Sequence, residues 1–156
     1  MKISTKGYYS VRAIIDIAIR AKNSPVSLSS ISIRENISLH YLEQLFMKLR
    51  RSNLVKSVRG PGGGYVLAKK PEEISIGDVL QSVEESVVPK QICVTHSKNK
   101  IGSNRCDKID ECVSRLVWQK LSDKMMEILD SISLESLCHE HETLINKKAK
   151  GTGGRC

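Results

Sequence analysis

A glycine-rich run at residues 60–64, Gly-Pro-Gly-Gly-Gly, constrains the fold of this 156-residue chain more than any other feature. Stretches rich in strand-forming residues lie on either side of it, at residues 55–59 and 65–68. Glycine reaches backbone conformations that other residues avoid, so the run predicts the tip of a β-hairpin. A nucleotide-binding loop would instead need a following helix and a Lys-Ser/Thr pair. Neither is present, and we therefore favour the hairpin.

Three helices are predicted ahead of the hairpin, because apolar residues recur there at helical spacing. The first spans about residues 5–23, and the second follows Ser27 to about residue 35. Ser38 then caps a third helix, in which Leu39, Leu42 and Leu45 are expected to face the core. This order predicts a mainly α fold, a winged helix-turn-helix domain with a small β-hairpin wing, over residues 1–85.

The second half of the chain divides into a loop and helices. Ser75 and Asp78 resemble a capping box that opens a short helix. Periodicity is lost across residues 86–111, which we interpret as a cysteine-bearing loop. A long amphipathic helix is predicted from Cys112 to about residue 130, and Ser133 caps a short last helix that ends by residue 145. The basic, glycine-rich residues 146–156 are expected to be disordered.

Positive charge is concentrated in the first half of the chain. Residues 1–70 hold 13 lysines and arginines against 3 acidic residues, whereas residues 71–156 hold 12 against 14. A basic half of this kind suits a polyanion such as nucleic acid. No apolar run reaches the roughly 20 residues that cross a membrane. The first residues show no secretory pattern, so a cytoplasmic protein is expected.

The third predicted helix carries polar residues that are suited to reading DNA. His40, Glu43 and Gln44 fall on one face, at i, i+3 and i+4. Glutamine can bond adenine through both ends of its amide, and glutamate can accept from the amino group of cytosine. DNA phosphates repel a carboxylate, so a glutamate on this face is tolerated only where a base offers it a hydrogen-bond donor. Glu43 is therefore predicted to discriminate between bases. Ordinary solvation of an exposed helix face is the alternative interpretation.

The hairpin supplies the second set of candidate DNA contacts. Arg59 adjoins the tip, where Gly60 and Gly62 let the backbone approach a phosphate or enter a minor groove. Basic residues close in sequence are candidate phosphate contacts: Lys48, Arg50, Arg51 and Lys56.

Three of the five cysteines lie within twenty residues of one another: Cys93, Cys106 and Cys112. An odd number of cysteines, with none in the first half, is a poor disulfide framework. Clustered thiolates instead suit an iron–sulfur cluster or zinc. His96 stands three residues after Cys93 and is a candidate fourth ligand. Three unrelated free thiols are the alternative, and Cys138 is expected in the core.

Together these residues resemble the IscR-like iron–sulfur cluster regulator family. The members of this family are bacterial winged helix-turn-helix transcription repressors. The resemblance covers the chain to about residue 142. It is most specific over residues 1–9, over Ile-Ser-Leu-His-Tyr-Leu-Glu-Gln-Leu at 37–45 and over Val-Arg-Gly-Pro-Gly-Gly-Gly-Tyr at 58–65. Residues 116–123 look like the start of the family's dimer helix.

The resemblance implies a homodimer on a roughly palindromic double-stranded DNA operator, with no membrane and no small-molecule substrate as partner. It implies a 2Fe–2S cluster on Cys93, Cys106 and Cys112, a dimerisation helix within residues 112–145, and repression of cluster-assembly genes. It also implies a set of DNA contacts on the recognition helix and the wing: Ser38, His40, Tyr41, Glu43, Gln44, Arg59, Gly60, Pro61 and Gly62.

The chain departs from the family's pattern beside the cysteines. The family's third cysteine is usually followed three residues later by a histidine, and here that position is Arg115; the gap between Cys93 and Cys106 is also longer than usual. The fourth ligand is therefore open between His96 and a small exogenous molecule. A nitric-oxide or redox sensor with a labile 4Fe–4S cluster is the alternative function. A zinc or thiol redox protein is a third, but no Cys-x-x-Cys pair and no acid–base constellation supports an enzyme.

Overall fold

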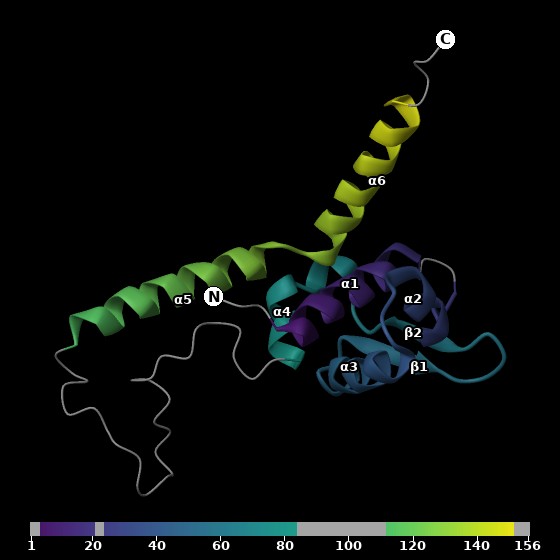
Figure 1. Ribbon diagram of the computed structural model, residues 1–156, viewed down its shortest axis with the longest axis horizontal. Helices are drawn as coiled ribbons and strands as arrows, with labels where there is room; N and C mark the ends of the chain where they lie inside the picture. The colour runs from purple at the N-terminus through teal and green to yellow at the C-terminus, as the bar shows by residue number, and fades with distance from the viewer. Residues whose placement is uncertain (1–3, 21–23, 84–111, 152–156) are drawn as a thin grey trace, which may run out of the picture.

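The computed structural model describes residues 4–20, 24–83 and 112–151. Over these residues the chain forms a helical body that carries a two-stranded wing, and two helices extend from this body (Figure 1). The predicted loop at residues 86–111 lies outside the described residues.

The body opens with three helices: α1 (Thr5–Arg20), α2 (Leu28–Glu35) and α3 (Leu39–Arg51). The Ser27 hydroxyl accepts from the backbone N–H of Ser30, and the Ser38 hydroxyl accepts from that of Tyr41, so Ser27 caps α2 and Ser38 caps α3, the latter as predicted. Between α2 and α3 the chain turns at Asn36, whose φ of 51° lies in the left-handed region that asparagine tolerates. The predicted helix-turn-helix is confirmed.

The core lies between these helices and is almost wholly aliphatic. The buried residues of α3 recur at i, i+3, i+4 and i+7, as in an amphipathic helix: Leu42, Leu45, Phe46 and Leu49. Ile14 and Ile17 of α1 and Ile31 of α2 are fully buried in the same cluster. The prediction that Leu39 faces this core is wrong, because the residue is 40% exposed. It opens α3, one turn before the first buried position.

The wing consists of β1 (Val55–Val58) and β2 (Gly64–Leu67), which pair antiparallel. Each strand lies within one residue of its predicted bounds. The Gly63 N–H donates to the Gly60 carbonyl at 2.9 Å across the tip. Tyr65 also pairs with Val26, just before α2, through hydrogen bonds of 2.9 and 2.8 Å. This bridge attaches the wing to the helix-turn-helix.

A short 3-10 helix, η1 (Pro71–Glu73), leads from the wing to α4 (Ile76–Val83). Ser75 and Asp78 form the predicted capping box. The Ser75 hydroxyl accepts from the Asp78 N–H, and the Asp78 carboxylate accepts from the Ser75 N–H, both at 3.0 Å. Helix α4 contacts α1, α3 and α5, so it connects the body to the C-terminal helices.

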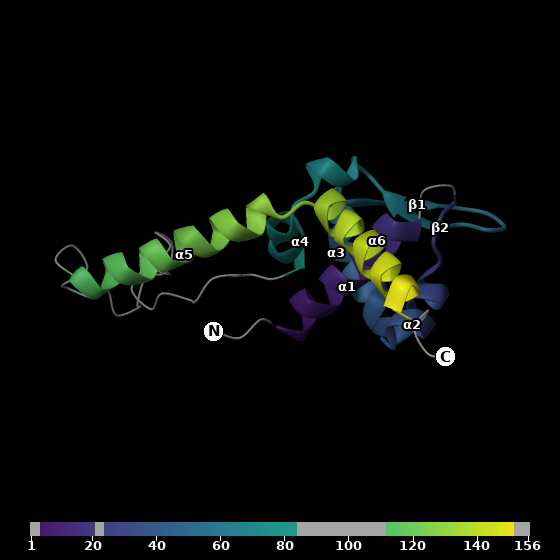
Figure 2. The ribbon, with the colours of Figure 1, turned by 90° about the horizontal axis from the view of Figure 1, so that it is seen from above.

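The predicted long helix is α5 (Val113–Ser131), which projects away from the body in both views (Figures 1 and 2). None of its residues is buried. Exposed large apolar side chains lie along most of its length: Val113, Leu116, Val117, Trp118, Leu121 and Ile128. Among the described helices, none is both long and apolar enough to span a membrane.

The last helix, α6 (Leu134–Gly151), begins at the predicted cap, where the Ser133 hydroxyl accepts from the Ser136 N–H at 3.1 Å. Its first turn joins the core, because Leu134 is fully buried. The prediction of a short last helix is wrong, and so is that of disorder over residues 146–151, since α6 continues to Gly151. Lysine and alanine, which dominate residues 147–150, are good helix formers, and lysines favour a helix C-terminus. Residues 152–156 lie outside the described part.

Candidate nucleic-acid interface

The solvent side of α3 carries the three side chains that are predicted to read bases. The side chains of His40 and Glu43 are 82% and 59% exposed, and Gln44 is exposed as well. Gln44 Nε2 lies 3.1 Å from His40 Nε2, and His40 Nδ1 lies 3.8 Å from a Glu43 carboxylate oxygen. The structure therefore brings the three together as one polar cluster. We call it the α3 cluster; its groups can exchange these contacts and water for base edges.

Tyr41 lies on the flank of α3 and is half-buried against α1. Its ring meets the Tyr9 ring edge-on, with the centroids 5.9 Å apart. The Tyr9 centroid lies 5.7 Å from that of Tyr8, and the Arg12 guanidinium lies over Tyr8 at 5.7 Å. Aromatic pairs in this geometry attract, so Tyr41 holds the start of α3 against α1. Sequence reasoning missed Tyr9, although adjacent tyrosines are a signal in a chain with 4% aromatic residues.

The tip of the wing is exposed, and Arg59 beside it is exposed too. Gly60 and Gly62 have φ angles of 109° and 75°, and a β-carbon at either position would meet nothing within 4 Å. Backbone conformation rather than crowding therefore calls for glycine at the tip. Together with the exposed Pro61, these residues form a low, uncovered backbone segment that a phosphate or a groove can approach closely.

Gly63 and Gly64 allow close backbone contacts that fix the position of the wing, whereas Gly60 and Gly62 set the conformation of its tip. A β-carbon at Gly63 would overlap the Val58 carbonyl, and one at Gly64 would overlap the Val26 carbonyl. On the other side, the Tyr65 ring packs edge-on against Phe46 of α3, with the centroids 4.8 Å apart. The wing is thus fixed both to the chain before α2 and to α3.

The basic residues predicted to contact phosphates differ in their surroundings. Arg50, Arg51 and Lys56 are exposed. Lys48 is half-buried, and its Nζ donates to the Val83 carbonyl at the end of α4, at 3.1 Å.

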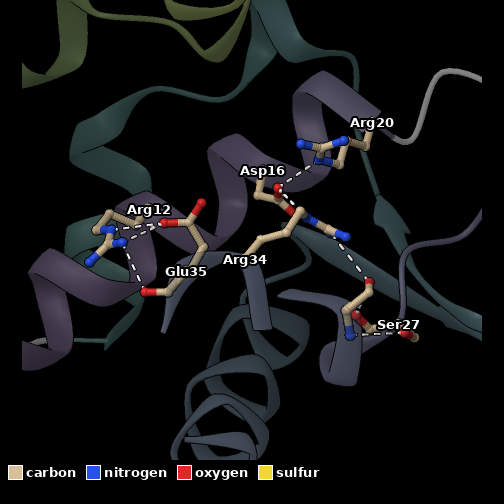
Figure 3. Close-up of polar contacts among 7 residues, drawn as sticks. Arg12, Asp16, Arg20, Ser27, Arg34 and Glu35 are labelled. Atoms are coloured by element: carbon tan, nitrogen blue, oxygen red, sulfur yellow. Dashed lines mark hydrogen bonds and ion pairs between the residues drawn. The ribbon is translucent and has the colours of Figure 1, made fainter. Parts of the chain in front are cut away.

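Two ion pairs hold α2 against α1 (Figure 3). The Asp16 carboxylate, 5% exposed, accepts from Arg34 at 2.9 and 2.6 Å and from Arg20 at 2.9 Å. The Arg12 guanidinium donates to both the carboxylate and the backbone carbonyl of Glu35, each at 2.9 Å. Because Glu35 ends α2, this second pair fixes the point at which the turn toward α3 begins.

The electrostatics of Asp16 follow from this geometry. Burial raises the pKa of its carboxyl, but the hydrogen bonds and charges of Arg34 and Arg20 outweigh burial, so the net pKa lies below the usual value. The hydrogen bond to Asp16 in turn raises the pKa of Arg34. Sequence reasoning missed this pair. A carboxylate between Ile15 and Ile17 of an apolar helix is the signal, because a buried charge needs a partner.

Of the predicted cluster ligands, Cys112 lies within the described residues, whereas Cys93, His96 and Cys106 lie outside them. Cys112 is the N-cap of α5, and its Sγ lies 3.1 Å from Ser114 Oγ. The Ser114 hydroxyl and the backbone of the first turn lower the pKa of this thiol. Within the described ranges, His, Cys, Asp and Glu side chains do not gather in a group of three that could hold a metal ion. Cys138 is half-buried and packs against the core.

Comparison with known proteins places the whole arrangement in one family. The model of the Rrf2 family, described as iron-dependent transcriptional regulators, matches residues 3–140. The chain is 42% identical over 144 residues to the HTH-type transcriptional regulator IscR of Pectobacterium atrosepticum, covering 92% of this chain and 83% of that protein. It is 44% identical over 142 residues to IscR of Aliivibrio salmonicida, covering 91% and 80%.

Solved structures agree with this placement. The structure of T. potens IscR superposes with a TM-score of 0.72 and 38% identity, covering 92% of this chain and 90% of that one. CymR, the global cysteine regulator of B. subtilis, also gives a TM-score of 0.72, with 36% identity and coverage of 90% and 98%. The predicted winged helix-turn-helix is thereby confirmed, as is a DNA-binding regulator rather than an enzyme. The chain belongs to the Rrf2 family of iron-dependent transcriptional regulators.

Proposed function

We propose that this regulator is a homodimer that represses cluster-assembly genes and senses iron–sulfur supply through a cluster on Cys93, Cys106 and Cys112. The observation that carries the proposal is the exposed α3 cluster, which lies on a helix fixed to an exposed, glycine-tipped wing. Both elements belong to the strongly basic half of the chain.

On DNA, we assign the α3 cluster to base edges in the major groove. Gln44 is suited to adenine and Glu43 to the amino group of cytosine. Ser38 caps α3, and Tyr41 holds the start of α3 against α1. We assign both residues to positioning α3 on the sugar–phosphate backbone of the DNA. Arg59 and the backbone of Gly60, Pro61 and Gly62 are assigned to a minor groove, which an uncovered tip can enter.

The donor set fits an iron–sulfur cluster. Cys112 offers a half-exposed thiol whose pKa is lowered by its hydrogen bonds, and the thiolate is the form that ligates iron. Arg115, one turn along α5, cannot ligate, because a guanidinium has no free lone pair near neutral pH. Its charge can offset that of an anionic thiolate cluster. A bound cluster, for which we propose the 2Fe–2S type, supplies a redox-active and removable group.

Helix α5 supports the dimer. It projects from the body and exposes apolar side chains along most of its length, which is costly for a helix that has no partner (Figure 1). A second copy is the partner that a two-fold operator requires, since pairing two such helices sets the spacing of two recognition helices.

A nitric-oxide or redox sensor with a labile 4Fe–4S cluster is the second candidate. The observation that favours it is Arg115, which stands where the resemblance leads us to expect a histidine ligand. A cluster with a weak or exogenous fourth ligand would be easier to dismantle.

One experiment tests the proposal and separates the alternatives. The protein is purified without air, its visible spectrum is recorded, and iron and sulfide are counted per chain. Binding to the promoter of a cluster-assembly operon is then compared with binding to a scrambled duplex. Two irons per chain and a preference for the promoter support the proposal, and four irons support the nitric-oxide sensor. Colourless protein with stoichiometric zinc, or equal binding to both duplexes, contradicts both.

A further inference from the structure

His40 and Gln44 lie one turn apart on the solvent side of α3, and their contact defines which nitrogen of the imidazole carries the proton. Gln44 Nε2 lies 3.1 Å from His40 Nε2. An amide nitrogen can only donate a hydrogen bond, so His40 Nε2 accepts, and the imidazole is neutral with its proton on Nδ1. His40 Nδ1 lies 3.8 Å from a Glu43 carboxylate oxygen, whose charge favours a proton on that side of the ring.

The same contact orients the side-chain amide of Gln44. One N–H of the amide is bound to His40, which leaves the second N–H and the oxygen available to a DNA groove. A donor beside an acceptor matches the N7 and the 6-amino group of adenine. Gln44 can therefore read adenine while it keeps its hydrogen bond to His40.

Protonation of His40 reverses this orientation. An imidazole takes up a proton between about pH 8 and pH 5, and both nitrogens of the cation are donors. Because two donors cannot form a hydrogen bond with each other, the Gln44 amide has to turn over and present its oxygen to His40 Nε2. The donor and the acceptor that face the groove then exchange places, and adenine meets the wrong group at both positions.

The other charged side chains near α3 are engaged elsewhere or lie in solvent. On α1 and α2, which pack against α3, five of them form ion pairs with one another: Arg12, Asp16, Arg20, Arg34 and Glu35. Asp78 caps its own helix α4, and Lys6 of α1 and Lys56 of β1 are exposed. Within the part of the chain that the structure describes, Glu43 is therefore the charged group that His40 contacts.

We propose that His40 is a positioning residue that sets the orientation of Gln44, so that protonation of His40 weakens the preference of Gln44 for adenine. The inference rests on the proposed function, because that function assigns Gln44 to a base edge. In the free protein, water competes for the exposed contact between the two side chains. In a groove this water is displaced, and an unmatched donor or acceptor becomes costly. Selectivity for the operator therefore falls as the pH falls.

A phosphate contact is the competing role for a protonated His40, and the two roles predict different measurements. A cationic phosphate contact strengthens binding to every duplex on acidification, and it steepens the slope of log affinity against log salt by about one. It leaves the ratio between the affinities for two duplexes unchanged, because it contributes equally to both. A positioning residue for Gln44 changes this ratio at the one base pair that Gln44 reads.

The test compares the full-length wild-type protein with His40→Gln, His40→Arg and Gln44→Ala. His139→Gln, at an exposed position of α6, is the matched control. Affinities for the promoter of a cluster-assembly operon and for its single-base variants are measured anaerobically by fluorescence anisotropy at pH 8 and pH 5.5. The base pair that Gln44 reads is the one whose substitution no longer matters in Gln44→Ala.

We expect the wild-type preference for adenine at that pair to fall about tenfold between pH 8 and pH 5.5, because an ordinary histidine is neutral in about one molecule in ten at the lower pH. The side-chain oxygen of His40→Gln can still accept from Gln44, so this variant should keep the preference at both pH values. An arginine can only donate, so His40→Arg should show the low preference at both. His139→Gln should behave as the wild type.

Three results would overturn the inference alone. They are a wild-type preference that is equal at both pH values, a fall of the same size in His40→Gln, and a full preference for adenine in His40→Arg. A Gln44→Ala protein that keeps every base preference, or a wild-type protein that binds the promoter and a scrambled duplex equally, would overturn the proposed function and the inference with it.

Discussion

The Asp16 carboxylate of α1 accepts two hydrogen bonds from the Arg34 guanidinium of α2, at 2.9 and 2.6 Å. This pair matters because Ile31 is the one buried residue of α2, so the helix depends on polar contacts as well as on apolar packing. A charge-assisted contact of two parallel bonds fixes orientation as well as distance. The placement of the helix-turn-helix on α1 therefore depends on an ion pair as much as on apolar packing.

Asp16→Asn should destabilise the protein by about 2 kcal/mol, because a neutral amide loses charge-assisted bonds that contribute roughly 1.5–3 kcal/mol. For a chain of this length the melting temperature should fall by roughly 4–8 °C, measured by circular dichroism. Glu127→Gln is the matched control, since Glu127 pairs with Lys124 on the exposed surface of α5 and such pairs contribute little. Equal shifts in the two variants would contradict the role given to Asp16.

The same pair predicts sensitivity to acid. The pKa of Asp16 is lower in the folded protein than in the unfolded chain, so its stabilising contribution is complete above the unfolded value of about 3.9. The contribution is lost as pH falls through the folded pKa. Chemical unfolding between pH 7 and pH 2 should show the wild-type protein losing more stability than Asp16→Asn below about pH 4. Parallel profiles would show that another carboxylate governs the acid response.

Glu43→Ala should relax sequence preference rather than simply weaken binding. The Glu43 side chain is 59% exposed and lies within the α3 cluster, where it can repel bases that offer no donor. Discrimination between the preferred duplex and single-base variants should fall about tenfold, or about 1.4 kcal/mol. Glu43→Gln should behave alike if charge is responsible, and Glu135→Gln on α6 serves as a control. A uniform loss of affinity for all duplexes would argue against the assigned role.

Replacing Leu121 and Met125 together by charged residues should produce monomers that no longer bind DNA specifically. Leu121 is 44% exposed and Met125 half-buried on a helix with no buried residue. Charges there oppose burial against a second α5. Sedimentation velocity measures the mass, and the exposed Lys120→Glu on the same helix is the control. An intact dimer in the double variant would place the interface elsewhere.

Features that depend on neighbouring residues could be predicted from the sequence. The hydroxyls of Ser27, Ser38 and Ser133 each accept from the N–H three residues later, and Ser75 does so within its capping box. The hairpin strands were predictable because glycine at the tip and strand formers beside it act locally. The fold could therefore be predicted from the sequence. The α3 cluster could be predicted too, because its position follows from helical spacing alone.

Features that depend on distant residues could not be predicted. Lys48 and Val83 are 35 residues apart, and nothing in the local sequence separates a lysine that donates to a backbone carbonyl of α4 from one that contacts a phosphate. Leu39 fits the apolar period, yet its exposure depends on where the body ends. Helix α6 continues to Gly151 although its second half is largely polar, and Leu134 anchors its first turn in the core. Cluster assignment rests on Cys93 and Cys106, which lie outside the described residues.

The durability of the cluster depends on its fourth ligand, and the sequence narrows the choice. Arg115 is excluded by its protonated guanidinium. Asp107 and Asp110 offer hard oxygen donors that match iron–sulfur chemistry poorly. His96 is the best candidate within the chain, because an imidazole three residues from Cys93 has a chelating spacing.

We expect a cluster that forms on Cys93, Cys106 and Cys112 and is lost readily in air. His96→Ala should shorten its lifetime, because it removes the proposed imidazole ligand. Arg115→His should lengthen the lifetime, because it places an imidazole one helical turn from Cys112, at the spacing found in the resembling family. The measurement is the decay of visible absorbance after anaerobic reconstitution, with iron counted per chain. Unchanged decay in both variants would place the fourth ligand elsewhere. A triple alanine variant of the three cysteines that still takes up a cluster would refute the whole assignment, since no thiolate of the proposed set would then be required.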